Sequence, residues 1–216
     1  MNLPNFDAIH LVSDLHMGGE GKFQIFKETQ RLVEYIKWVG STQTDGQKIA
    51  LILNGDVIDT LAEDQDTQYI AINNAVLLVE RIMQDKSFKP IWDALAEFVK
   101  VAQRRLIIVL GNHDIEMAFP PVQQAIVHRL TSGDESAMGR INFSTSGAGY
   151  TCWVGKSKVF CTHGNEEDEW NFIRYEDLSK AARRLNAGKL LEVDDWEPNA
   201  GTMLGLIYLN RRRRQR

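Results

Sequence analysis

Acidic, amide and imidazole side chains follow four separate β-rich segments of this sequence, each close to the end of its segment. The first two segments are followed by Asp14-Leu15-His16 and by Gly55-Asp56-Val57-Ile58-Asp59. The next two are followed by Gly111-Asn112-His113-Asp114 and by His163-Gly164-Asn165. Carboxylate oxygens, amide oxygens and imidazole nitrogens bind metals such as Mn, Fe or Zn, and they also transfer protons. Four such endings indicate one site that is assembled from several loops.

Each of these residues also has an ordinary structural interpretation. An Asp that follows a strand often caps the next turn, and this is an open alternative for Asp59. Asn112 alone could serve turn formation, and His163 alone could be a surface histidine. The repetition of the pattern at four strand ends favours the site, whereas His10 and His128 stand outside the pattern and are expected to be structural.

Two carboxylates and two histidines from different loops are more than one cation needs. A carboxylate shared by two cations about 3.5–4 Å apart would explain the excess, and such pairs clamp the attacking and leaving oxygens in phosphoryl chemistry. The cations would also lower the pKa of a bridging water, which gives hydroxide near neutral pH. The mixture of ligands suits Mn, Fe or Zn better than Ca or a thiolate-bound Zn.

The elements that must position these residues alternate between strand and helix. Apolar runs that end at turn signals read as buried strands, and ligands of open α/β sheets lie outside the carboxyl ends of such strands. The patterns predict strands over 8–13, 48–53, 105–110 and 141–143 and a hairpin over 149–162. They predict helices over 22–39, 67–85, 89–102, 119–130, 167–187 and 202–214. The expected fold class is α/β, a mixed β-sheet sandwich flanked by helices on both faces.

Composition indicates a soluble protein of ordinary character. The 216 residues fit one domain or one and a half, with 44% hydrophobic and 25% charged residues. No run approaches the roughly 18 apolar residues of a membrane span, and no secretory leader is recognisable, so we expect a cytoplasmic protein. Cys152 and Cys161 lie in apolar context and are expected to be buried and reduced.

Taken together, the four blocks resemble the first four signature blocks of the calcineurin-like metallophosphoesterases in order and rough spacing, over residues 8 to about 165. The resemblance implies a βαββα-type sandwich with a dinuclear metal centre, Mn before Fe or Zn. It implies hydrolysis of a phosphomonoester or phosphodiester by a metal-bound hydroxide. It also implies the roles of the ligands: Asp14 and His16 on the first cation, Asp56 on both, and Asn112 and His163 on the second.

The same resemblance gives His113 a catalytic role in place of a ligand role. His113 would hydrogen-bond the phosphoryl group or protonate the leaving oxygen, and Asp114 or a neighbouring acid would hold it. The family's fifth block, Gly-His-x-His, has no counterpart in this sequence. We therefore expect that a missing C-terminal segment or a second chain completes the metal site, with a divergent enzyme as the alternative.

The resulting domain prediction is an incomplete catalytic core over 1–165 and a truncated helical cap or insertion over 166–216. Two alternative functions stay open. One is a nuclease whose arginines at 211–214 and 216 touch a phosphate backbone, which the net charge of −4 does not favour. The other is a non-catalytic binding scaffold that has lost full metal binding.

Overall fold

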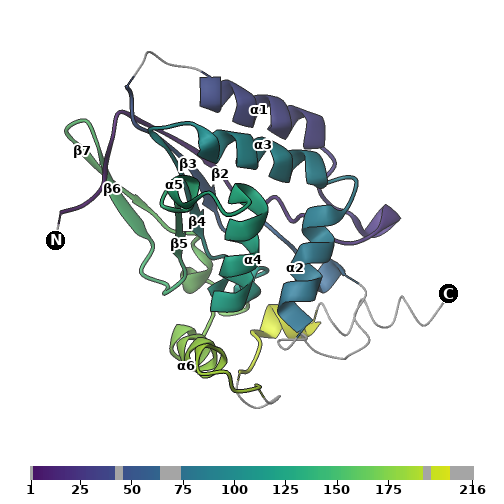
Figure 1. Ribbon diagram of the computed structural model, residues 1–216. Helices are drawn as coiled ribbons and strands as arrows, with labels where there is room; N and C mark the ends of the chain where they lie inside the picture. Colours follow the sequence, from purple (N-terminus) through teal and green to yellow (C-terminus); the bar gives the residue numbers. More distant parts are fainter. Residues whose placement is uncertain (1, 42–45, 64–73, 192–195, 205–216) are drawn as a thin grey trace.

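The computed structural model describes residues 2–41, 46–63, 74–191 and 196–204 (Figure 1). The larger sheet is parallel, with the strand order β2-β3-β4-β5. The smaller sheet has the order β1-β6-β7, with β1 parallel to β6 and β6 antiparallel to β7. The larger sheet consists of β2 (Ala8–Val12), β3 (Ile49–Asn54), β4 (Arg104–Val109) and β5 (Ile141–Ser144). The smaller sheet consists of β1 (Asn5–Phe6), β6 (Tyr150–Val154) and β7 (Ser157–Cys161).

The central strand β3 is buried along its whole length because both of its faces are covered. Ala50 and Ile52 pack between the two sheets, in an apolar cluster that also holds Cys152 and Cys161. The alternate residues of β3 belong to the larger core beneath the helices. Side chains alternate between the faces of a strand, so this continuous apolar run serves both cores. Both cysteines are free and buried, as predicted.

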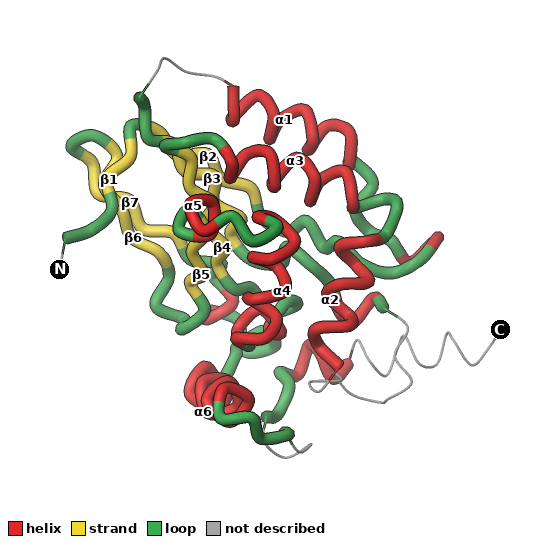
Figure 2. Tube along the Cα trace, viewed as in Figure 1, coloured by secondary structure: helices red, strands yellow, loops and turns green. Residues whose placement is uncertain are grey.

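The helices cover one face of the larger sheet, and the smaller sheet covers the other (Figure 2). The sandwich and its flanking helices are therefore confirmed. Helices on both faces of one sheet are not what the described residues form, because the hairpin β6–β7 and β1 take the second face. The helices are α1 (Thr29–Ser41), α2 (Ala75–Gln84), α3 (Lys89–Lys100), α4 (Pro120–Thr131), α5 (Glu135–Met138) and α6 (Tyr175–Asn186).

Two predicted helices begin later in the structure than in the sequence-based prediction, those expected over 22–39 and 167–187. Helix α1 begins at Thr29, and Gly21–Phe23 form a separate 3-10 turn before it. Helix α6 begins at Tyr175, after a 3-10 turn at Asn165–Glu167. The first part of the helix predicted over 67–85 lies outside the described residues. Residues 200–204 are helical, and the rest of the helix predicted over 202–214 also lies outside them.

The segment that follows the fourth block packs onto the main core. Ile173, Leu178, Ala181, Leu191 and Trp196 are all buried in the same apolar cluster as the helices of the larger sheet. The described part of 166–216 is therefore joined to the core by apolar packing. Among the described residues, no helix combines the length and apolar character that crossing a membrane requires.

Candidate metal centre

Three of the predicted ligands have left-handed backbone conformations, which residues other than glycine rarely adopt. The φ angles are 55° at Asp14, 44° at His16 and 52° at Asp56. Backbone hydrogen bonds between the loops after β2 and β3 hold these conformations. The Asp14 amide donates to the Gly55 carbonyl at 3.1 Å, and the His16 amide donates to the Asp56 carbonyl at 2.8 Å. Strained backbone that is held in this way is typical of functional sites.

Asp56 lies at the centre of the converging loops. Its Oδ2 atom is 3.3 Å from Nε2 of His163 and 3.6 Å from Nε2 of His16, and its Oδ1 accepts the His113 backbone amide at 2.9 Å. Burial would raise the pKa of Asp56, but the contacts with His163 and His113 hold it below its ordinary value. The structure thus places an ionised carboxylate where four loops meet.

Two glycines allow this close approach. A Cβ atom on Gly55 would lie 2.3 Å from Nδ1 of His163, and the φ of Gly55 is 85°. A Cβ atom on Gly111 would lie 2.2 Å from Oδ1 of Asp56. Both distances are far below van der Waals contact, so any larger residue would push His163 or Asp56 out of place.

His163 connects the hairpin loop to the larger sheet. Its Nδ1 lies 3.0 Å from the carbonyl oxygen of Asn54, which can only accept, so Nδ1 carries the hydrogen and Nε2 faces Asp56. Burial would lower the pKa of His163, but Asp56 raises it to about 9. When the ring is protonated, Nε2 also carries a proton, and a cation that binds at Nε2 must displace it.

Asp59 lies behind two of the imidazoles. Its Oδ2 is 3.4 Å from Nδ1 of His16 and 3.5 Å from Nδ1 of His113, distances at the long end for hydrogen bonds. Its Oδ1 accepts the backbone amides of Leu61 and Ala62. The capping interpretation of Asp59 therefore holds, and the same carboxylate also contacts the site. Burial would lower the pKa of His113, and the contact with Asp59 raises it above its ordinary value.

Of the two expectations for the acid beside His113, Asp114 or a neighbouring acid, the contacts of Asp114 favour the second. Its Oδ1 accepts the Gly111 amide and its Oδ2 accepts the Val57 amide, both at 2.7 Å. The carboxyl group is fully buried, and burial raises its pKa. Asp114 therefore ties the loops after β3 and β4 together, whereas Asp59 is the acid whose side chain lies beside the His113 ring.

Two groups of three candidate ligands share Asp56. One consists of His16, Asp56 and His113, the other of Asp14, Asp56 and His163, and within each group the ligand atoms lie within 4.8 Å of one another. The family resemblance implied that Asp14 and His16 bind one cation and that His113 binds none, whereas the spatial grouping puts Asp14 with His163 and His16 with His113. A buried carboxylate, surrounded by the partly exposed imidazoles and the exposed Asp14 carboxylate, offers oxygen and nitrogen donors that fit divalent transition metals.

Asn112 is buried, and its Nδ2 donates to Oδ1 of Asn171 at 3.3 Å. Asn171 lies in the turn before α6, beyond the last of the four blocks. Reasoning from the sequence missed it because a lone Asn after an acidic run has no spacing that marks it.

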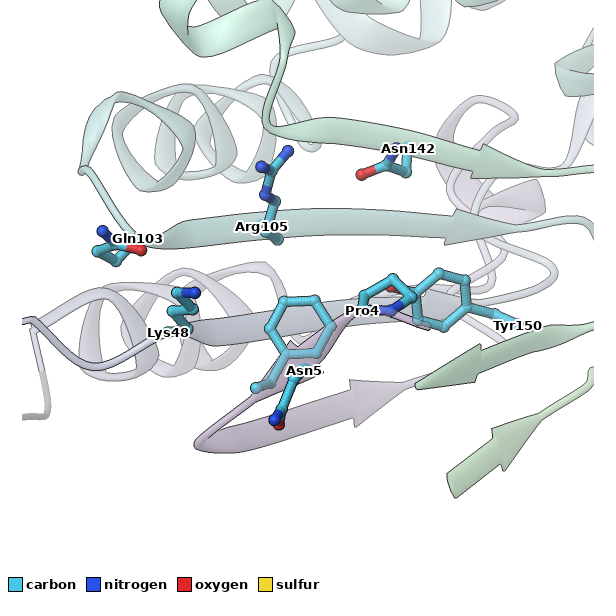
Figure 3. Close-up of a pocket in the computed structure, with 8 residues that line it drawn as sticks. Pro4, Asn5, Lys48, Gln103, Arg105, Asn142 and Tyr150 are labelled. Carbon is cyan, nitrogen blue, oxygen red and sulfur yellow. The ribbon is translucent and has the colours of Figure 1, made fainter. Parts of the chain in front are cut away.

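A cavity of about 370 Å³ lies elsewhere, at the amino ends of the strands (Figure 3). Lys48 and Gln103, which line it, come just before β3 and β4, and Arg105 and Tyr150 come from two different sheets. The metal-binding candidates follow the carboxyl ends of the same strands, so this cavity is separate from them.

Comparison with known proteins identifies the family. Searches of curated proteins and of solved structures each gave no match. The family model of the calcineurin-like phosphoesterases matches residues 8–207, which extends well beyond the four blocks and includes α6. Because the match covers most of the chain, the protein belongs to the calcineurin-like phosphoesterase family.

Proposed function

We propose that this protein hydrolyses a phosphate monoester or diester with the help of two divalent cations, Mn before Fe or Zn, held on either side of Asp56. Family membership and the acid–imidazole cluster support metal-dependent phosphoester hydrolysis in general. The observation that carries the dinuclear proposal is that both candidate ligand groups contain the Asp56 carboxylate.

The proposed ligands are Asp14, His16, Asp56, Asn112 and His163. Support comes from Asp14, His16 and His163, whose candidate ligand atoms lie within 4.8 Å of an Asp56 oxygen. When bound, the cations would supply an activated water and stabilise negative charge on the phosphoryl oxygens. Asp56 has two oxygens to offer, and its lowered pKa keeps it ionised at neutral pH. His163 and His16 present Nε2 toward the same Oδ2, so both rings are oriented before a cation arrives.

We propose that His113 faces the substrate. Its side chain is 32% exposed, against 19% for His16 and 8% for His163, so it is the imidazole that a substrate can reach most easily. Its raised pKa favours the protonated ring near neutral pH. Protonated His113 would donate to a phosphoryl oxygen or to the leaving oxygen as the phosphorus–oxygen bond breaks.

The test is hydrolysis of an aryl phosphomonoester and an aryl phosphodiester by the full chain with Mn²⁺, with and without chelator. Asp56→Asn, which keeps size but removes charge, should abolish turnover and metal binding. Asp134→Asn is the matched control, because Asp134 is an exposed cap of α5 and Asn caps equally well. Hydrolysis that survives both the chelator and Asp56→Asn would overturn the proposal.

The two alternatives are distinguished by adding single-stranded DNA as a third substrate and by measuring Mn²⁺ binding. A scaffold would bind little Mn²⁺ and hydrolyse neither ester. A nuclease would cleave single-stranded DNA faster than the aryl diester. The arginines at 211–214 and 216, on which the nuclease alternative rests, lie outside the described residues.

A further inference from the structure

The loop that precedes α6 contacts the loop after β4 through the side chain of Asn171, which accepts a hydrogen bond from Asn112. We infer that Asn171 is a positioning residue, which turns the Asn112 carboxamide so that its oxygen faces the cation site. This inference rests on the proposed function, because it assigns a holder to one of the proposed ligands. Asn112 is 7% exposed, so its amide is oriented by protein groups and hardly by solvent.

Asp168 determines which end of the Asn171 amide, and through it which end of the Asn112 amide, faces its neighbour. The Nδ2 of Asn171 donates to Oδ2 of Asp168 at 2.8 Å. An ionised carboxylate can only accept, so Asn171 must turn its NH2 group toward Asp168. The Oδ1 atom of Asn171 then faces Asn112 and can only accept. Asn112 therefore donates to it through Nδ2, at a distance of 3.3 Å.

The polarity of Asn112 follows from these two steps. With Nδ2 committed to Asn171, the Oδ1 of Asn112 points away from that contact, and within the described ranges no hydrogen bond reaches it. An amide oxygen is a metal ligand, whereas an amide NH2 group repels a cation. The acceptor-only Asp168 therefore sets which end of Asn112 is available to the cation.

The backbone of Asn171 is anchored independently of its side chain. Its carbonyl oxygen accepts Nδ2 of Asn165 at 3.3 Å and Nδ2 of Asn199 at 3.5 Å. Its amide donates to the carbonyl of Asp168 at 3.1 Å, and the Trp170 amide donates to Oδ1 of Asp168 at 2.9 Å. Replacing the Asn171 side chain should therefore leave these backbone hydrogen bonds in place and remove the two side-chain contacts, with Asp168 and with Asn112.

The first experiment is calorimetric titration of the full chain with Mn²⁺, in wild type and in Asn171→Leu. Groups that orient a ligand typically contribute about 10–100-fold in metal affinity, so one binding step should weaken by about that factor. Asn186→Leu is the matched control, because Asn186 is an exposed residue at the end of α6, and it should bind as wild type does. Asn171→Ala tests the same contact if the leucine variant does not fold.

Two further variants separate positioning from mere structure. In an Asn112→Ala background, Asn171→Leu should have no additional effect on Mn²⁺ affinity, because the group through which it acts is gone. The double variant Asp168→Asn with Asn171→Asp, in which the two side chains are exchanged, should bind Mn²⁺ more tightly than Asp168→Asn alone. In that pair the carboxylate moves to position 171, where it can only accept from Asn112, and the net charge is unchanged.

The outcomes distinguish this inference from the proposed function. Wild-type protein that binds no Mn²⁺ would overturn both. Wild-type protein that binds Mn²⁺ while Asn171→Leu and Asn171→Ala bind equally well would overturn only the role of Asn171. If Asn171→Leu lowered Mn²⁺ affinity equally in the wild-type and Asn112→Ala backgrounds, the role of Asn171 would also be overturned, because the effect would then not depend on Asn112.

Discussion

The Oδ2 atom of Asp59 lies 3.5 Å from Nδ1 of His113, and the same oxygen lies 3.4 Å from Nδ1 of His16. The two rings pack edge to face with their centroids 4.7 Å apart. The other oxygen of Asp59 is held by two backbone amides, so the carboxylate has little freedom to turn. One fixed acid therefore lies within ion-pair distance of two imidazoles of the candidate site.

Asp59→Asn should lower the pKa of His113 in the metal-free protein. The negative charge of Asp59 favours the protonated ring, and a neutral amide of the same size removes that effect, so the shift is downward. The measurement is a titration of the histidine ring signals by NMR. Asp177→Asn, on the surface of α6, is the control. An unchanged pKa of His113 would show that Asp59 does not act on this ring.

His113→Ala should lose turnover and keep its metals, because the proposed role of His113 is on the phosphoryl group. General acid–base groups typically contribute about 10²–10⁴-fold to the rate. Turnover of an aryl phosphate and metal content by mass spectrometry are measured on the same sample, with the exposed His128→Ala as control. Parallel loss of metal and activity would make His113 a ligand, in line with its spatial grouping with His16 and Asp56.

The strand ends could be predicted from the sequence, and the contacts between side chains could not. Asp14, Asp56 and His113 each follow an apolar run whose direction and carboxyl end were readable, so their convergence followed from the geometry of a parallel sheet. The roles of Asp59 and Asp114 depended on which acid would find backbone amides and which would face a ring. Both acids stand two or three residues from a strand-end ligand, and only the turn geometry distinguishes them.

The coverage of the sheet also needed tertiary information. Apolar residues of β3 alternate between two cores, yet the run reads as uniformly apolar. The residues of the run do not predict whether helices or a second sheet cover each face of the strand. Asn171 was missed for the related reason that its contact with Asn112 spans 59 residues of sequence.

Glu116→Gln should remove a pH-dependent cost to stability. Glu116 is fully buried, its Oε1 accepts the Thr60 hydroxyl at 2.9 Å, and burial raises its pKa to about 7. Between pH 4.5 and 7 the unfolded chain has released this proton and the folded chain has kept it, so the contribution of Glu116 to stability falls as pH rises. Across this pH range the contribution of Glu116 to the free energy of unfolding falls by about 3 kcal/mol at most.

Chemical unfolding at pH 5 and pH 8 measures this effect. The free energy of unfolding of Glu116→Gln relative to wild type should be higher at pH 8 than at pH 5. Glu97→Gln, on the exposed face of α3, should show no such difference. An equal difference between Glu116→Gln and wild type at both pH values would contradict the prediction.

The last prediction concerns how tightly the chain holds its cations. The five proposed ligands, with Asp56 counted twice, give each cation about three protein contacts, against the four to six positions that these metals fill. Asp59 and Asp168 cannot add to the count, because their carboxylates are committed to imidazoles and to amide groups. Water would occupy the open positions, and the affinity should be lower for each imidazole that is lacking.

We therefore expect the 216-residue chain to fold, to bind at least one Mn²⁺ weakly and to hydrolyse phosphate esters slowly. The measurement is calorimetric titration with Mn²⁺, with aryl phosphate hydrolysis followed in parallel. A polypeptide segment that carries two histidines in a Gly-His-x-His arrangement, added in cis or as a separate chain, should raise both affinity and rate. A segment with both histidines changed to alanine is the control. Two tight sites and rapid hydrolysis by the chain alone would contradict this prediction, and they would mean that further groups of this chain coordinate the metals.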